Sequence, residues 1–400
     1  MGLPPFRGSF TQQEPIPEEG IAAAVEVMQT GRLHRYNVLP GEESETVALE
    51  REYAAWQGAP YCLAVASGGQ AMQIALRAAG IQSGDKVLTN AFTLAPVPGA
   101  IAGVGAEPVL VEITDDLVID LNDLRAKAER SGAKVLMLSN MRGHLCDMDA
   151  LIALTDALQI TLLEDCAHTM GASWRGQKSG NFGLAGCFSA QTYKHINSGE
   201  GGLVTSCDAA FMARATMMSG SYMLFDRHGA GPSADVYDDI KLDTPNMSAR
   251  MDNLRAAILR PQLAKLDDAI DRWNERYRVV ETGLSQSNAF HLPKRPSEEF
   301  FVGSSIQFMV PEIREHGARA FLKACAERGV ELKWFGDADP VAFTSAHSSW
   351  RYVPEQSLPQ TDSILAGLFD MRLPLTFSLA DCELIAAHIA EVAAEMVANA

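Results

Sequence analysis

The stretch CFSAQTYKHINSGEGG, residues 187–202, places Lys194 between two segments of different character. An apolar, strand-like run, 186–190, precedes the lysine. A glycine-rich turn follows it and leads into a second apolar run, 203–206. Most lysines are solvated surface charges, but this one is expected between the end of a buried strand and a tight turn. The segment therefore predicts a lysine whose position is fixed by the fold.

A second strand-like run, 160–164, is followed at once by Asp165. An amine that can form an imine and an aspartate at the carboxyl end of a strand are the two groups that pyridoxal phosphate (PLP) needs. The amine holds the aldehyde, and the carboxylate keeps the pyridine nitrogen protonated so that the ring can accept electrons. Asp165 alone would more often be a helix N-cap. Together with Lys194 it indicates a PLP site.

The first half of the chain alternates short β-rich runs with helical stretches, which favours a mainly parallel sheet covered by helices on both faces. The expected strands are 61–66, 86–89, 108–111, 134–138 and 160–164, and the expected helices are 70–79, 121–130 and 148–157. In such sheets ligands bind beyond the carboxyl ends of the strands. The turn Ser67-Gly68-Gly69-Gln70 falls there and could seat a phosphate at the start of a helix, although alone it would be an ordinary turn.

After residue 208 the chain changes character. Residues 219–246 are loop-like, and a long helical stretch, 248–285, is interrupted near Pro261. The remaining pattern predicts strands at 304–310 and 330–334 and helices at 318–328 and 379–398. We therefore predict two domains: a large PLP-binding domain, 1–260, with an N-terminal arm and a substrate loop, and a small C-terminal α+β domain, 261–400.

Bulk composition excludes several classes of function. The 400 residues are 47% hydrophobic and carry 33 Lys plus Arg against 50 Asp plus Glu, a net charge of −17, so nucleic acid is not an expected partner. No apolar run approaches the roughly 20 residues of a membrane span. Seven scattered cysteines without a CxxC pair indicate reduced thiols in a cytoplasmic protein, with no disulfide framework and no metal site.

Three motifs make the chain resemble the DegT/DnrJ/StrS family of PLP-dependent sugar aminotransferases, as a divergent member. The family's S-G-T-A-A-L phosphate turn appears as SGGQAM at 67–72, and its E-D-A-A-Q/H-x-x-G-A run appears as EDCAHTMGA at 164–172. Its lysine signature, F-S-x-x-x-x-K-x-h-x-x-G-E-G-G, spans 188–202. The resemblance implies fold type I, the aspartate aminotransferase-like α/β architecture: a large, mainly parallel seven-stranded sheet domain and a small C-terminal α+β domain.

The resemblance also implies roles for individual residues. Lys194 takes the Schiff-base position, Asp165 pairs with the pyridine nitrogen, and His168 lies near the cofactor's phenolic oxygen. An amide at Asn246, or the hydroxyl of Ser248, reaches the phosphate bound by a neighbouring subunit, which implies a homodimer with shared active sites. The full set expected to bind cofactor is Ser67, Gly68, Gly69, Gln70, Leu94, Asp165, His168, Ser189, Lys194 and Asn246.

Departures from the family pattern cluster near the expected substrate pocket. Leu94 stands where the family has an aromatic ring that stacks on the cofactor, and Gly69 replaces the threonine of the phosphate turn. The substrate loop, 31–37, is followed by an acidic insertion containing Glu42, Glu43 and Glu45. We expect Arg35, Tyr36 and Trp334 to contact substrate, the first two by entering the partner's pocket.

The resemblance implies an aminotransferase that moves an amino group from an amino acid, glutamate or glutamine, to a keto sugar, a keto-cyclitol or another polar carbonyl compound. One alternative is a PLP-dependent sugar dehydratase of the same family, in which histidine replaces the lysine. The register set by the turn 199–202 places Lys194, rather than His195, at that position. The other alternative is a catalytically silent regulatory or binding homologue, against which the retained Lys194–Asp165 pair argues.

Overall fold

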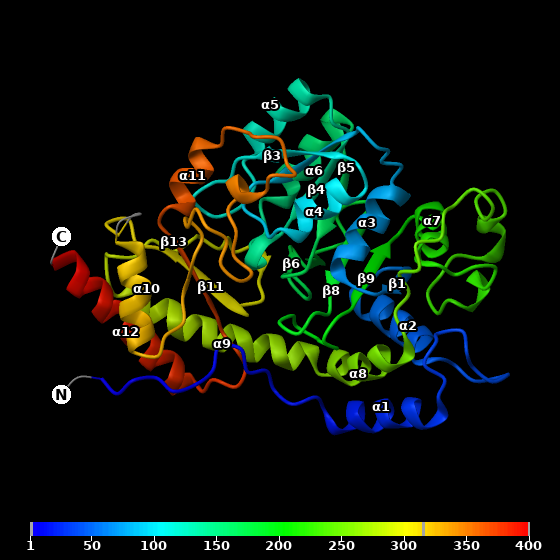
Figure 1. Cartoon of the computed structure of the whole chain (residues 1–400), viewed down its shortest axis with the longest axis horizontal. Coiled ribbons are helices and arrows are strands. Elements are labelled where there is room, and N and C mark those ends of the chain that lie inside the picture. Colours follow the sequence, from blue (N-terminus) through cyan, green and yellow to red (C-terminus); the bar gives the residue numbers. More distant parts are fainter. Residues whose placement is uncertain (1–2, 314–316, 399–400) are drawn as a thin grey trace.

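The computed structural model describes residues 3–313 and 317–398, and its centre is a seven-stranded sheet in the order β1-β9-β8-β5-β4-β2-β3 (Figure 1). Only β9 runs against its neighbours, and the other pairs in this sheet are parallel. The predicted α/β fold with a large, mainly parallel sheet is confirmed. The strands are β1 (Tyr61–Val65), β2 (Lys86–Asn90), β3 (Glu107–Val111), β4 (Val135–Ser139), β5 (Thr161–Asp165), β8 (Ala185–Ser189) and β9 (Gly202–Ser206).

Helices cover both faces of this sheet, and successive side chains of one strand enter opposite cores. Val135 and Met137 of β4 pack with α3 (Gly68–Ala78), α4 (Pro96–Gly103) and α7 (Ala209–Ser219). Leu136 and Leu138 pack on the other face, with α2 (Glu45–Gln57), α5 (Leu121–Ser131), α6 (Met148–Leu158) and α8 (Asn253–Ala264). Strands buried on both faces explain the continuous apolar runs in the sequence.

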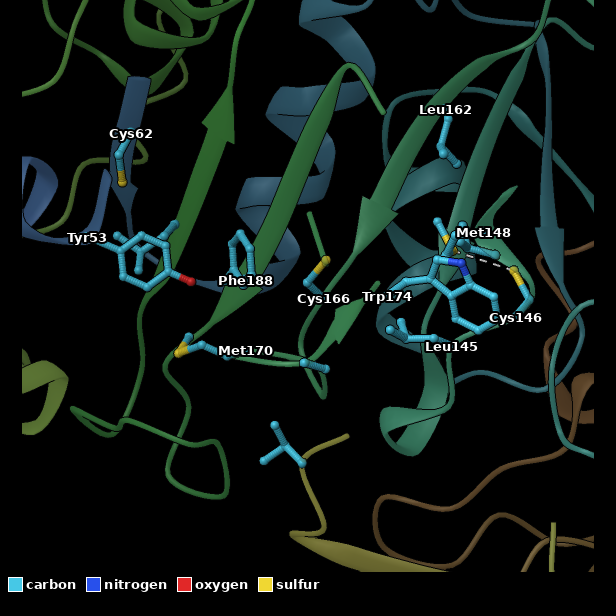
Figure 2. Close-up of a cluster of buried hydrophobic side chains, with 14 of the residues drawn as sticks. Tyr53, Cys62, Leu145, Cys146, Met148, Leu162, Cys166, Met170, Trp174 and Phe188 are labelled. Atoms are coloured by element: carbon cyan, nitrogen blue, oxygen red, sulfur yellow. Dashed lines mark hydrogen bonds between the residues drawn. The ribbon is translucent and has the colours of Figure 1, made fainter. Parts of the chain in front are cut away.

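Figure 2 shows part of the second core, where Phe188 of β8 packs against Tyr53 of α2 with ring centroids 5.4 Å apart. Trp174 lies near Leu145 and Met148 in the same view. Trp174 belongs to a minor sheet made of β6 (Ser173–Trp174), β7 (Gln177–Lys178) and β10 (Glu299–Phe300). Packing of Phe188 therefore fixes the end of β8, the strand that leads to Lys194.

The C-terminal part forms a smaller three-stranded sheet in the order β11-β13-β12, covered by helices. Its elements are α9 (Leu266–Ser285), β11 (Ser305–Met309), α10 (Ala318–Glu327), β12 (Lys333–Trp334), β13 (Leu368–Arg372) and α12 (Leu379–Ala398). Its core also contains Phe6 and Phe10 of the N-terminal arm, each with its ring centroid 5.0 Å from that of Phe377. The arm thus runs beside the C-terminal helix (Figure 1). The domain division at residue 260 stays a prediction.

Two details of the expected helices were wrong. Residues 248–252 are not helical, because Asp252 caps α8 by accepting a hydrogen bond from Arg255 N at 2.9 Å. The break between α8 and α9 falls at Lys265, and Pro261 lies inside α8. The strand expected at 330–334 is also shorter, since only Lys333 and Trp334 pair with β13. Short 3₁₀ turns occupy Met141–Gly143, Phe225–Arg227, Ala234–Tyr237 and His347–Ser349.

The acidic residues after the substrate loop have structural partners. They lie just before and at the start of α2, next to α1 (Glu18–Thr30), and neither helix was expected from the sequence. Glu42 pairs with Arg32 at 3.0 Å, Glu45 with Arg260 at 2.6 Å, and Glu43 with Arg51. Carboxylates at the beginning of a helix also stabilise it, because they interact favourably with the positive end of the helix dipole.

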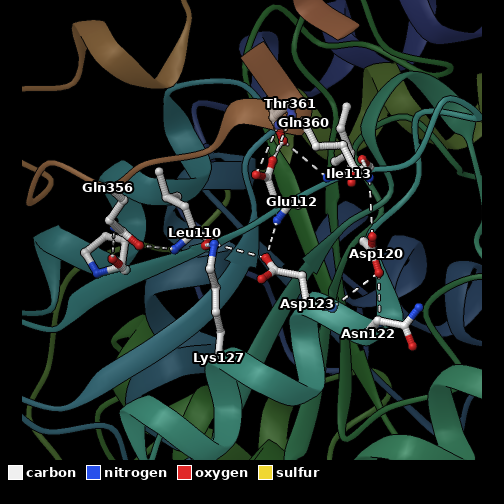
Figure 3. Close-up of polar contacts among 11 residues, drawn as sticks. Leu110, Glu112, Ile113, Asp120, Asn122, Asp123, Lys127, Gln356, Gln360 and Thr361 are labelled. Atoms are coloured by element: carbon white, nitrogen blue, oxygen red, sulfur yellow. Dashed lines mark hydrogen bonds and ion pairs between the residues drawn. The ribbon is translucent and has the colours of Figure 1, made fainter. Parts of the chain in front are cut away.

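Residues 356–361 of the C-terminal part form hydrogen bonds with the edge of the large sheet (Figure 3). Glu112, directly after β3, accepts hydrogen bonds from Thr361 N at 2.7 Å and Thr361 Oγ1 at 2.5 Å, both at the start of α11 (Pro359–Leu365). Gln356 bonds to Leu110 N at 2.9 Å and to Pro108 O at 3.0 Å. Residues 356–361 therefore belong physically with β3.

Candidate active site

A pocket of about 370 Å³ opens at the carboxyl ends of β1, β4, β5 and β8. The parallel sheet brings Ser67 and Lys194, which are 127 residues apart in the sequence, into the same pocket. Eight of the ten residues expected to bind cofactor line the pocket: Ser67, Gly68, Gly69, Leu94, Asp165, His168, Ser189 and Lys194.

Lys194 Nζ lies 2.8 Å from His168 Nε2 at the wall of this pocket. The other nitrogen of His168, Nδ1, accepts a hydrogen bond from Arg142 N at 3.4 Å, so the ring proton belongs on Nε2, facing the amine. Burial lowers the pKa of His168 well below its ordinary value. Burial, then the charge of Arg142, lowers the pKa of Lys194 to about 7, against the opposing charge of Asp165. The Lys194 amine can therefore gain or lose a proton near neutral pH.

Asp165 is held at the end of β5 by a chain of hydroxyl groups. Thr93 Oγ1 donates to Ser139 Oγ at 2.7 Å, and Ser139 Oγ donates to Asp165 Oδ2 at 3.0 Å. Asp165 Oδ1 accepts a hydrogen bond from Ala167 N at 3.1 Å. Burial raises the pKa of this carboxyl, while the charge of Lys194 opposes the rise. No helix begins after Asp165, since residues 167–171 form turns, so the N-cap alternative was wrong.

The turn at the start of α3 leaves backbone donors free for an anion. Gly68 and Gly69 occupy the first turn of the helix, where backbone N–H groups have no partner within the helix. A Cβ at Gly68 would lie 2.8 Å from Ser189 Cβ, so only glycine allows this close approach. The free N–H groups and the Ser189 hydroxyl fit a phosphate, while Lys194 and Asp165 fit the aldehyde and pyridine nitrogen of PLP.

The other predicted site residues lie outside this pocket. Gln70 N donates to Ser67 Oγ at 3.1 Å and so is already paired within the turn. Asn246 is exposed, with Oδ1 accepting a hydrogen bond from Ser248 N at 2.9 Å. Trp334 is 6% exposed and its Nε1 donates to Ala366 O at 2.9 Å, so it belongs to the core of the small sheet rather than to a substrate contact.

Arg35 and Tyr36 are likewise directed into the protein. Arg35 is 1% exposed, and its two terminal nitrogens each lie 2.8 Å from a carboxylate oxygen of Glu50. Tyr36 Oη is 2.7 Å from Nε2 of His228, whose Nδ1 contacts Arg35 at 2.9 Å. A buried guanidinium requires a carboxylate partner, and Glu50 supplies it. Within this chain neither side chain is free to bind substrate.

The pocket contains further residues that the sequence did not single out. Arg142 follows β4, Arg372 ends β13, and Tyr193 precedes the lysine, while Phe343 comes from the long connection between β12 and β13. None of them carried a signal in the sequence, since Tyr193 stands at an unspecified position of the lysine signature. The others come from segments whose position depends on the packing of the two sheets.

Comparison with known proteins agrees with this geometry. Residues 16–390 match the DegT/DnrJ/EryC1/StrS aminotransferase family. The L-glutamine:2-deoxy-scyllo-inosose aminotransferase of Streptomyces lividus is 31% identical over 288 residues, which cover 71% of this chain and 66% of that protein. The 3-amino-5-hydroxybenzoate synthase of Amycolatopsis mediterranei is 32% identical over 274 residues, 68% of this chain and 66% of that protein. The chain thus matches about two thirds of the length of these relatives.

Solved structures extend the similarity to nearly the whole fold. The crystal structure of 3-amino-5-hydroxybenzoic acid synthase aligns with a TM-score of 0.81 at 24% identity, covering 98% of this chain and 100% of that one. The aminotransferase DesV of S. venezuelae aligns with a TM-score of 0.78 at 26% identity, covering 94% of each chain. The family match spans both sheets and every residue of the pocket described above. The chain therefore belongs to the DegT/DnrJ/EryC1/StrS aminotransferase family.

Proposed function

We propose that this protein is a PLP-dependent aminotransferase that moves an amino group from an amino acid, glutamine or glutamate, to a keto sugar, a keto-cyclitol or a similar polar carbonyl compound. One observation carries the proposal: in a single pocket, Lys194 contacts the neutral imidazole of His168, with Asp165 and the free backbone donors of Gly68 and Gly69 around it. The relative named L-glutamine:2-deoxy-scyllo-inosose aminotransferase supports glutamine as donor and a keto-cyclitol as acceptor.

When bound, PLP supplies a conjugated ring that withdraws electrons from the substrate carbon. With PLP bound, Lys194, whose pKa is about 7, would take a proton from that carbon and return it at the neighbouring position. His168 Nε2, 2.8 Å away, holds the amine in place for both transfers. Asp165, oriented by Ser139, would keep a proton on the pyridine nitrogen.

Two observations weigh against the alternatives. His195 does not line the pocket, since its Nε2 lies 3.2 Å from Ser304 Oγ and its ring packs on Trp273. Lys194 therefore faces the cofactor site, which favours an aminotransferase over a dehydratase that uses histidine. A silent binding homologue would have no need for the chain of hydroxyls that orients Asp165.

A spectroscopic half-reaction tests the proposed function. Purified protein loaded with PLP should show a visible absorption band. Adding L-glutamine or L-glutamate without an acceptor should bleach the band as the amino group is retained on the cofactor, and a carbonyl acceptor should restore it. An unrelated D-amino acid serves as the control. A band that no proteinogenic amino acid bleaches would refute the aminotransferase proposal.

We also propose a homodimer in which each active site is completed by the neighbouring chain. Exposed apolar side chains gather on α1, where Ile21, Val25 and Met28 are 52%, 40% and 54% exposed at helical spacing. Tyr222 and Met223, near the Asn246 segment, are 56% and 55% exposed. Exposed apolar groups of this kind are typical of interfaces. The exposed amide of Asn246 is then available to the partner's phosphate.

Subunit mixing tests this shared site. Asn246→Ala should weaken PLP binding by about 10-fold or more, because a hydrogen bond to a charged group is lost. Mixing Asn246→Ala chains with Lys194→Ala chains should then restore activity at limiting PLP, since one site of each mixed dimer is intact. Ser248→Ala, tested in parallel, decides which of the two residues reaches the phosphate. If verified mixed dimers recover no activity, each chain builds its own site.

A further inference from the structure

The pocket wall that faces away from the phosphate turn carries more positive than negative charge. Three basic side chains line the pocket, Arg142, Lys194 and Arg372, and Lys333 lies beside them, 3.5 Å from Asp370. The buried carboxylates beside them are Asp165 and Asp370, and Glu200 at the margin of the pocket is exposed. Buried charges of one sign need a counterion. The excess therefore indicates that an anion completes the pocket.

Asp370 is already shared among several donors. It lies on β13 directly opposite Gln307 of β11 and Lys333 of β12. Its Oδ1 accepts a hydrogen bond from Gln307 Nε2 at 2.8 Å. Its Oδ2 lies 2.9 Å from Arg142 Nη2 and 3.5 Å from Lys333 Nζ. One carboxylate thus serves two cations and leaves at least one positive charge without a matching partner.

Arg142 keeps hydrogen-bonding capacity that the protein does not use. Its backbone adopts the left-handed conformation, with φ of 55°, in the turn after β4, and its side chain is only 6% exposed. Within the described residues, Nε and Nη2 form no hydrogen bond of good geometry, although Nη2 is close to Asp370. Buried N–H donors are nearly always paired in folded proteins. Arg142 lines the pocket, and its Nε is available to a ligand.

Arg372 completes a pair of guanidinium groups. It is two residues from Asp370 on β13, so both side chains leave the same face of the strand. Its Cζ lies 3.7 Å from the centre of the Tyr193 ring and 5.6 Å from that of Phe343, which orients the planar group. In the described part of the chain it forms no ion pair with a carboxylate. It too lines the pocket.

This charge lies apart from the seat for the cofactor's phosphate. The phosphate turn follows β1, and Arg142 follows β4, four positions further along the sheet order β1-β9-β8-β5-β4. Neighbouring strands are roughly 4.8 Å apart, so the two ends of the pocket are well separated at the level of the sheet. Lys194 and Asp165 lie between them. The cationic wall therefore faces the position of a substrate rather than that of the phosphate.

We propose that Arg142 and Arg372 bind a carboxylate of the molecule that reacts at Lys194, and that the carbonyl acceptor, like the amino acid donor, carries one. The proposal rests on the proposed function, because donor and acceptor of an aminotransferase occupy the same pocket in turn. A neutral acceptor would leave the two arginines without a counterion in one half of the cycle. Planar guanidinium groups match a carboxylate through paired hydrogen bonds.

Equilibrium binding of an unreactive dicarboxylate tests the arginine pair without any turnover. Glutarate should bind to PLP-loaded protein in calorimetric titration, and the neutral analogue glutaramide should not. Arg372→Gln should weaken glutarate binding by 10-fold or more, whereas Arg125→Gln, at an exposed arginine on α5, should leave it unchanged. Equal glutarate affinity in wild-type and Arg372→Gln protein of the same melting temperature would overturn the proposal.

Two further measurements separate this inference from the proposed function. Arg142→Lys retains the charge beside Asp370 but loses the fork of donors, so it should fold and still bind glutarate at least several-fold more weakly. In the half-reaction, ketones that carry a carboxylate should restore the visible band faster than neutral ketones of similar size. Bleaching by glutamine with no preference among ketones would contradict only the inference. Arginine-dependent glutarate binding without any bleaching would contradict only the aminotransferase proposal.

Discussion

Lys194→Ala is expected to lower turnover by about 10⁴-fold or more, because it removes both the group that holds the cofactor and the base that moves the substrate proton. The Lys194 amine is the only lysine amine that lines the pocket within the described residues. PLP should still bind weakly through the turn at Gly68 and Gly69. Turnover by stopped-flow absorbance and PLP affinity by equilibrium dialysis measure the two effects separately.

Lys323→Ala is the matched control, since the side chain of this lysine on α10 is 79% exposed and does not line the pocket. In wild-type protein, borohydride reduction followed by peptide mapping should find the cofactor attached at Lys194. Added methylamine should partly restore turnover to Lys194→Ala if the missing amine is the cause. An adduct on any other lysine would remove Lys194 from its assigned role.

Asp165→Asn is expected to reduce turnover by about 10²–10³-fold while changing PLP affinity much less, because an amide cannot keep the pyridine nitrogen protonated. The substitution preserves the size of the side chain. Its amide oxygen can still accept the hydrogen bond from Ala167 N, and its NH2 group can donate to Ser139 Oγ, a hydroxyl that can also accept. The loss should therefore appear in the rate of the half-reaction rather than in the melting temperature.

Ser139→Ala provides the graded comparison for Asp165. It removes the hydroxyl that donates to Asp165 at 3.0 Å but leaves the carboxylate itself, so the rate should fall by only about 10-fold, the worth of one ordinary hydrogen bond. If Asp165→Asn keeps near-normal turnover, the carboxylate serves only to order the turn through Ala167 N.

The sequence predicted the central sheet well because strands buried on both faces leave an unmistakable apolar pattern. β1, β2 and β5 begin or end within one residue of their expected bounds. Lys194 and Asp165 were found for a related reason: Asp165 ends β5 and Lys194 lies in the turn that follows β8, and the parallel topology places the ends of both strands at one edge of the sheet. Chemistry located at strand ends can be predicted once the strands are known.

Arg35 shows where this reasoning failed. A lysine or arginine in a polar loop looks available for substrate, and only the structure reveals that Glu50, on the unexpected helix α2, lies 2.8 Å away. Arg142 and Arg372, in contrast, line the pocket but were not predicted to do so. Their neighbours come from β13 and from the connection to it, so their place in the pocket depends on how the small sheet packs against the large one. The local pattern of apolar and polar residues contains no information about how the two sheets pack.

The N-terminal arm has a consequence for how the molecule is assembled in time. Pro4 O accepts a hydrogen bond from His388 Nε2 at 2.8 Å across a sequence separation of 384 residues, and Phe6 and Phe10 fill the same core as α12. During synthesis, the arm leaves the ribosome long before the helix that it packs against exists. Contacts of such separation form late and slowly. Closure of the small core is therefore expected to be the last folding step, after the central sheet has already enclosed Lys194.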